Sequence, residues 1–187
     1  MPAVMMAKLT MTPLKNGAKN TCVLPIIMRR IVLDTNCLLQ SLPSNSPYHK
    51  IWADVLNGQI QLCVNTEILN EYEDILAAKT TKEIARNVVE AIARLSTTYF
   101  QEVYIHFGLI TADVDDNKFV DCAVAANAEY IVTNDKHFEV LKDIPWPKLS
   151  IIKIKEFVEQ ITNNLHAIRH RCHHESLPKK AQEIAVF

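Results

Sequence analysis

Two aspartates in this chain follow runs of bulky apolar residues, and chemistry is expected at both positions. Asp34 ends the run Ile31-Val32-Leu33, and Asp135 closely follows Tyr130-Ile131-Val132. Such runs are typical of strands that are buried on both faces of a parallel sheet. Ligands bind in the crevice outside the carboxyl ends of such strands, which predicts a functional site beside both carboxylates. The alternative for Asp34 is a plain helix cap, because aspartate is favoured at that position.

Two further acidic residues can reach the same edge of the sheet. Asp116 precedes a helix that leads into the strand at 130–133, and either Asp115 or Asp116 is expected to cap that helix. Glu71 lies one turn beyond Glu67 on an amphipathic helix, so these two glutamates share one helix face. Three aspartates and one glutamate are therefore candidates for a single site.

Such a group of carboxylates supports metal-assisted hydrolysis. Carboxylates within about 4 to 6 Å of one another raise each other's pKa unless a cation compensates their charge. Mg²⁺ and Mn²⁺ prefer oxygen ligands and commonly bind a few carboxylates together with substrate phosphates. In phosphodiester hydrolysis such ions orient and deprotonate water, so the protein needs no nucleophile of its own.

Strands that alternate with helices are expected to bring these acids together. The predicted strands lie at 31–33, 61–64, 102–106, 130–133 and 149–154. The predicted helices lie at 48–57, from 66 onward, at 80–96, after 117, briefly after 134 and at 155–164. We expect Gly58 to stop the first of these helices. The alternation indicates an α/β protein with a parallel sheet.

The composition indicates a soluble globular protein from a reducing compartment. Of the 187 residues 49% are hydrophobic and 22% are charged, and no apolar run reaches the roughly 18 residues that a membrane span needs. The five cysteines are scattered and odd in number, which argues against a disulfide framework and favours a cytoplasmic protein. The three glycines do not cluster, which excludes the Gly-rich phosphate loops.

The net charge of −1 is unevenly distributed and predicts one acidic domain between basic tails. Residues 1–30 hold five basic and no acidic side chains, whereas residues 31–160 carry a net charge of −8. We expect a basic N-terminal tail at 1–28, either disordered or upstream of a native start at Met28. A domain at 29–164 and a polar basic tail at 165–187 follow. Histidines and a cysteine in that last tail are of zinc-ligand types, but a frayed tail is the preferred interpretation.

Four short runs resemble the PIN domain family when they are taken in this order. They are Ile31-Val32-Leu33-Asp34-Thr35-Asn36, Glu67-Ile68-Leu69-Asn70-Glu71-Tyr72, Asp115-Asp116-Asn117-Lys118-Phe119 and Ile131-Val132-Thr133-Asn134-Asp135. The similarity covers about residues 29–160, and it is greatest to toxin components of bacterial toxin-antitoxin systems. It implies a three-layer α/β/α sandwich around a five-stranded parallel sheet. It also implies a Mg²⁺- or Mn²⁺-dependent ribonuclease that cuts single-stranded RNA, with a cognate antitoxin protein as partner.

The resemblance also implies roles for individual residues. Catalysis and metal binding are expected of Asp34, Glu71, Asp116 and Asp135, with Glu67 as the second choice for the glutamate. Asp121 lies about 140° round the helix from Asp116 and is a candidate outer ligand. Supporting positions are expected at Asn36, Thr133 and Asn134. An acidic core repels phosphate, so RNA contacts are expected from Lys118, Lys136 and the basic tails.

Other enzyme classes fit the first strand less well. Phosphatases similar to haloacid dehalogenases place a second acid two residues after the first, where this chain has Asn36. Receiver domains need paired acids that Leu33-Asp34-Thr35 does not offer. A non-catalytic RNA-binding or scaffolding module is the alternative function, although degenerate members should lose an acid and none of the four is lost. The apolar helices over 48–96 are candidates for a homodimer or antitoxin surface, with core packing preferred.

Overall fold

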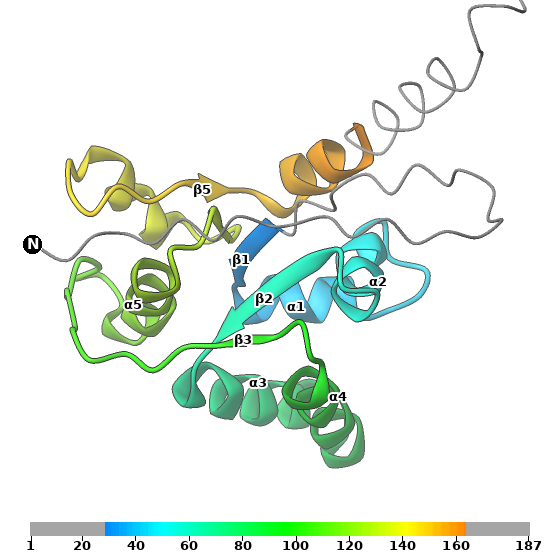
Figure 1. The fold of residues 1–187 in the computed structure, drawn as a ribbon. Helices are drawn as coiled ribbons and strands as arrows, with labels where there is room; N and C mark the ends of the chain where they lie inside the picture. Colours follow the sequence, from blue (N-terminus) through cyan, green and yellow to red (C-terminus); the bar gives the residue numbers. More distant parts are fainter. Residues whose placement is uncertain (1–28, 164–187) are drawn as a thin grey trace, which may run out of the picture.

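The computed structural model describes residues 29–163, which form a five-stranded parallel sheet flanked by helices (Figure 1). The strand order is β3-β2-β1-β4-β5, and every neighbouring pair is parallel. The strands are β1 Arg29–Leu33, β2 Ile60–Val64, β3 Tyr99–Phe100, β4 Tyr130–Val132 and β5 Ile151–Ile152. The predicted α/β fold class with five parallel strands is therefore confirmed.

Strand β1 lies at the centre of the sheet, and the carboxyl ends of β1 and β4 lie side by side. Ile31, Val32 and Leu33 are at most 1% exposed, as expected for a strand covered on both faces. Leu33 pairs with Val132, and the backbone N–H of Asp34 donates to the carbonyl of Val132 at 3.0 Å. The adjacency of these two strands brings the segments after them to one edge of the sheet.

Helices connect the strands on both faces of the sheet. They are α1 Thr35–Ser41, α2 His49–Leu56, α3 Thr66–Lys79, α4 Lys82–Arg94 and α5 Asn117–Ala126. Two 3-10 segments, η1 Val114–Asp116 and η2 Lys136–Asp143, flank α5 and β4 in the chain, and residues 154–163 are helical.

Side-chain caps and one glycine set the ends of these helices. Asn65 accepts a hydrogen bond from the N–H of Ile68 at the start of α3, and Thr81 accepts one from Ile84 at the start of α4. Helix α2 ends at Leu56, and Gly58 follows with a φ of +69°, a conformation that L side chains rarely adopt. The predicted glycine stop is confirmed.

The third strand differs from the prediction. It was expected at 102–106, but β3 comprises only Tyr99–Phe100, and the chain from 101 to 111 is irregular. β3 pairs with the end of β2, and the last bond of this ladder joins the N–H of Gln101 to the carbonyl of Val64. Asn65 then starts α3, so no neighbouring strand remains for 102–106 to pair with. The alternating polarity of residues 102–106 carries no information about where the partner strand β2 ends.

Apolar side chains from the sheet and the helices fill one continuous core. Tyr72, Phe119, Phe138 and Phe157 are among its largest fully buried members. The cysteines at 37, 63 and 122 are buried free thiols, and burial raises the pKa of each to about 12. No helix within residues 29–163 is long and apolar enough to cross a membrane. The predicted tails, Met28 and the His/Cys segment near the C-terminus lie outside the described residues.

Candidate active site

Asp34 lies between the end of β1 and the start of α1, at the carboxyl edge of the sheet. Its Oδ1 accepts from the backbone N–H of Asn36 (3.3 Å), and its Oδ2 accepts from the hydroxyl of Thr133 (2.8 Å). Burial raises the pKa of Asp34, these two hydrogen bonds oppose the rise, and the nearby charges of Asp135 and Glu71 add to it. Asp34 is therefore a helix cap and also a member of a carboxylate cluster, which comprises Asp34, Glu71, Asp116 and Asp135.

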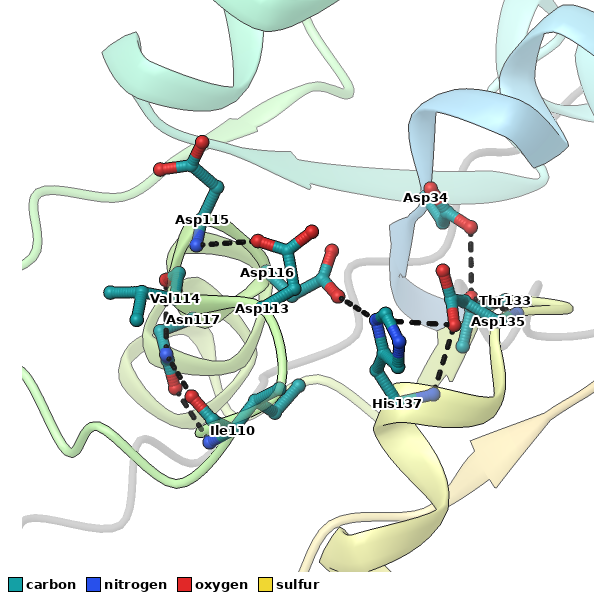
Figure 2. Close-up of polar contacts among 10 residues, drawn as sticks. All are labelled: Asp34, Ile110, Asp113, Val114, Asp115, Asp116, Asn117, Thr133, Asp135 and His137. Atoms are coloured by element: carbon teal, nitrogen blue, oxygen red, sulfur yellow. Dashed lines mark hydrogen bonds and ion pairs between the residues drawn. The ribbon is translucent and has the colours of Figure 1, made fainter.

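Asp135 faces Asp34 across the ends of the two central strands (Figure 2). The Thr133 hydroxyl joins them, because it donates to Asp34 and accepts from the backbone N–H of Asp135 at 2.9 Å. Asp135 also caps η2 by accepting from the N–H of His137 at 2.9 Å. Thr133 thus links the Asp34 side chain to the backbone of Asp135.

Asp116 lies on the other side of His137 (Figure 2). Its Oδ2 is buried without a hydrogen-bond partner, and the nearest cationic candidate is His137 Nδ1 at 3.4 Å. The pKa of Asp116 is raised to about 6. Burial is the largest cause, the charges of Asp113 and Asp135 add to the rise, and His137 opposes it. A buried carboxylate oxygen without a hydrogen bond is costly and is uncommon in folded proteins.

Glu71 completes the cluster from helix α3. Its Oε1 accepts from the hydroxyl of Thr35 at 2.5 Å, and its Oε2 pairs with the ammonium of Lys118 at 2.6 Å. The next residue, Tyr72, is fully buried and donates its hydroxyl to the carbonyl of Leu33. Helix α3 is therefore fixed to the end of β1 beside Asp34. Glu67, the second choice for this position, is exposed.

The remaining predicted residues occupy varied positions around the cluster. Asn36 and Lys136 are exposed, and the contact of Asn36 with Asp34 comes from its backbone N–H. Asn134 accepts from the N–H of Ile154 at 3.4 Å and so joins β4 to the final helix. Lys118, an expected RNA contact, is paired with Glu71. Their roles at the site stay predictions.

Asp121 is buried and has structural partners of its own. Its Oδ1 accepts from the backbone N–H of Phe107, and its Oδ2 lies 3.0 Å from the ring nitrogen Nδ1 of His106. These contacts hold the irregular segment 101–111 against α5. A role for Asp121 as outer ligand stays a prediction.

The cap before α5 differs from the expectation. Asp113 is the side chain that caps this region, because it accepts from the N–H of Asp115 at the start of η1. Asp116 occupies the position before α5 but makes no capping hydrogen bond. The Asn117 side chain bonds both the N–H and the carbonyl of Ile110, which joins the start of α5 to the segment before η1. Because Asp116 makes no capping hydrogen bond, its carboxylate is left for other partners.

Three residues beside these carboxylates had not been predicted. Thr35 binds Glu71, His137 lies between Asp116 and Asp135, and Asp113 stands beside Asp116. His137 follows Asp135 by two residues, so a search for nitrogen ligands near predicted acids could have found it. The pairing of Thr35 with Glu71 joins segments 36 residues apart and leaves no local signal.

The donor atoms around Asp116 fit a divalent metal ion. Asp113, Asp116 and His137 each offer a ligand atom, and these atoms lie within 4.8 Å of one another. Carboxylate oxygens suit Mg²⁺ and Mn²⁺, and an imidazole nitrogen suits transition-metal ions. The buried Asp116 oxygen has no hydrogen bond and lies 3.4 Å from His137 Nδ1, so a bound ion would add counter-charge there. Asp34, Asp135 and Glu71 extend this group along the sheet edge.

The fold is that of an α/β protein with acidic residues at the carboxyl edge of its parallel sheet. A sequence comparison gives the family. The PIN domain matches residues 30–137, more than half of the chain, and the chain belongs to this family. PIN domains are generally nucleases. No curated relative matches the chain by sequence.

Three of the solved structures similar to this chain contain VapBC proteins. VapBC2 of Rickettsia felis bound to a promoter DNA fragment matches at 17% identity and a TM-score of 0.47, covering 66% of this chain and 98% of that one. DNA-bound VapBC of Salmonella typhimurium matches at 18% identity and a TM-score of 0.47, covering 68% and 99%. VapBC-1 of Haemophilus influenzae matches at 14% identity and a TM-score of 0.47, covering 67% and 98%.

Proposed function

We propose that this chain is a Mg²⁺- or Mn²⁺-dependent endoribonuclease that hydrolyses phosphodiester bonds of single-stranded RNA. The observation that carries the proposal is the buried oxygen of Asp116, which has no hydrogen bond and lies within a group of further acids. Membership of a family of nucleases supports the same reaction class. Asp34, Glu71, Asp116 and Asp135 are the proposed ligands, with Asp113 and His137 added by the geometry around Asp116.

The residues of the chain hold and orient the reacting groups. A bound metal ion would supply activated water and neutralise charge on the phosphate oxygens. Thr133 links the Asp34 side chain to the Asp135 backbone, and Thr35 orients Glu71. Lys136 is exposed in the first turn of η2, beside Asp135, where it can meet the RNA backbone. Without a bound cation, the acidic edge would repel a phosphate.

The biological role that we propose is the toxin of a toxin-antitoxin pair. Support comes from the order of the four motif runs, which is most similar to that branch of the family. An antitoxin protein would then be the partner, and a homodimer is compatible with the partly exposed apolar residues Leu56 and Ile84 on α2 and α4. Expression of the wild-type chain in bacterial cells should arrest growth, whereas Asp34→Asn should not.

The deciding assay incubates the purified protein with single-stranded RNA and Mn²⁺, with and without a chelator. We expect cleavage that the chelator abolishes. Asp34→Asn and Glu71→Gln should each lower the rate by about 100-fold or more, because even outer partners of metal ligands are worth about 10- to 100-fold. Asparagine is as good a helix cap as aspartate, so Asp34→Asn should retain the fold. Glu73→Gln, an exposed position on α3, is the matched control and should cleave normally.

Each result of this assay discriminates between the proposals. Cleavage that survives both the chelator and Asp34→Asn would exclude the metal mechanism. RNA that is bound but never cut, with or without Mn²⁺, would favour the non-catalytic RNA-binding or scaffolding module instead.

A further inference from the structure

Both oxygens of the Glu71 carboxylate have a partner within the chain itself. One oxygen accepts from Thr35, and the other pairs with Lys118 at 2.6 Å. The side chains of Lys118 and Glu71 are only 17% and 24% exposed, so water screens this ion pair less than a surface pair. Any other cation that binds Glu71 through this oxygen must therefore compete with the Lys118 ammonium.

Lys118 has a second acidic environment within reach. It lines a hollow of about 350 Å³ together with Glu67, Asp115, His106 and Val114. Glu67 lies one turn before Glu71 on α3, and Asp115 lies in η1 just before α5, and both carboxylates are exposed. The flexible four-carbon stem of lysine allows its ammonium to change partners without movement of the backbone. The ammonium can thus leave Glu71 and remain beside negative charge.

We propose that Lys118 is a displaceable counter-ion of Glu71. When a divalent cation binds Glu71, the ammonium turns into the hollow beside Glu67 and Asp115. The proposal rests on the proposed function, because it takes Glu71 as a metal ligand. The affinity of the site for metal is then set by an exchange of cations on one carboxylate. Lys118 is a positioning residue in this scheme and tunes how readily the metal binds.

Isothermal titration calorimetry of the purified full chain with Mn²⁺ alone tests the exchange without any activity measurement. Lys118→Met keeps most of the apolar stem and removes the competing charge. We expect it to bind Mn²⁺ about five- to tenfold more tightly than the wild type, the effect expected for loss of one partly buried ion pair. Lys118→Gln serves the same purpose if the methionine variant does not fold.

Two controls separate exchange at Glu71 from a general change of charge. Lys136→Met removes one positive charge next to Asp135, but Lys136 is exposed and makes no ion pair with Glu71. It should change Mn²⁺ affinity by about twofold or less, because exposed charges are screened. The second control combines Lys118→Met with Glu71→Gln. Without the Glu71 carboxylate the gain from Lys118→Met should disappear, which is the non-additivity of residues in direct contact.

The outcomes distinguish failure of this proposal from failure of the proposed function. Tighter Mn²⁺ binding by Lys118→Met that requires Glu71 supports the exchange. Equal or weaker binding by Lys118→Met, with binding lost in Asp34→Asn, would overturn the exchange and leave the metal site intact. An equal gain from Lys136→Met would also overturn it. If the wild type binds no Mn²⁺, the metal-dependent function and the exchange both fail.

Discussion

The two sides of the acidic edge compensate their negative charge in different ways. On the α3 side, both oxygens of Glu71 have partners, one a hydroxyl and one an ammonium. On the α5 side, Asp116 has Asp113 and Asp135 as charged neighbours, and one of its oxygens is buried with no hydrogen bond. The chain neutralises the first carboxylate with an ammonium, whereas the second has the imidazole of His137 at 3.4 Å as its ion-pair partner.

This difference indicates where a metal ion would stabilise the fold most. Burial of a charged oxygen without a partner costs free energy, and such cost is commonly retained at functional sites. A cation near Asp116 would remove that cost at once. A cation at Glu71 would replace an interaction that already exists, so its net effect on stability would be smaller.

The largest effect expected from this contrast is stabilisation by Mn²⁺. At a free concentration about 100 times the dissociation constant, Mn²⁺ should raise the free energy of unfolding by about 2.7 kcal/mol, or Tm by roughly 5 to 10 °C. Asp116→Asn should lose most of this shift in a thermal unfolding experiment. Asp74→Asn, an exposed aspartate on α3, is the control and should keep it. A full shift in Asp116→Asn would contradict the assignment.

With a chelator present at pH 7, substitutions on the two sides should change stability in opposite directions. Glu71→Gln leaves the Lys118 ammonium without its carboxylate and should lower the free energy of unfolding by about 1 to 3 kcal/mol. Asp116→Asn removes a carboxylate charge whose buried oxygen has no hydrogen bond, and it should raise the free energy of unfolding by about 1 kcal/mol. Urea unfolding measures both values. Two changes of the same sign would remove the contrast.

The gain from Asp116→Asn should depend on pH in a defined window. The folded-state pKa of Asp116 is about 6 and its ordinary value is 3.8, so the folded wild type binds more protons than the unfolded chain between these values. The stability that the protonated Asp116 carboxyl gives to the folded wild type is therefore fully present below about pH 4. It is lost as the pH rises through about 6. The asparagine does not titrate. Urea unfolding in chelator should show no gain at pH 3.5 and the full gain at pH 7.5.

The smallest effect concerns the imidazole between the two aspartates. His137 opposes the rise in the pKa of Asp116, so His137→Ala should move that pKa above about 6. Carbon-detected NMR titration of the Asp116 carboxyl in the presence of a chelator measures the change. His106→Ala is the matched control, because His106 contacts Asp121 and should leave Asp116 unaffected. An unchanged pKa in His137→Ala would show that the ring contributes no compensation.

The sequence was sufficient to predict a five-stranded parallel sheet and the position of Asp34 and Asp135 at its carboxyl edge. Asp34 and Asp135 follow buried apolar runs, and the parallel arrangement alone brings the ends of such strands together. The boundaries of β3 were not predictable from local polarity, because they depend on where β2 ends and α3 begins at Asn65. Residues that follow a buried strand are thus easier to predict than the length of an edge strand.

The partners of the acids were not predictable to the same extent. Glu71 was selected by the residue that follows it, but its contact with Lys118 depends on how α3 and α5 pack. His137 was close in sequence to a predicted acid, and only its place between Asp116 and Asp135 shows its relevance. Local sequence indicates which residue types are present, whereas compensation of charge is a property of tertiary packing.

The hydrogen bond from Tyr72 to the Leu33 carbonyl joins the two segments that carry the proposed ligands Glu71 and Asp34. The donor is the residue after Glu71 and the acceptor is the residue before Asp34, so this contact joins the two carboxylates within one residue on each side. Helix α3 and strand β1 should therefore move as one body at this point. A fixed gap between ligands discriminates between ions by radius, because a rigid site cannot expand around a larger cation. Discrimination between Mg²⁺ and Ca²⁺ would then originate in a tyrosine that touches neither ion.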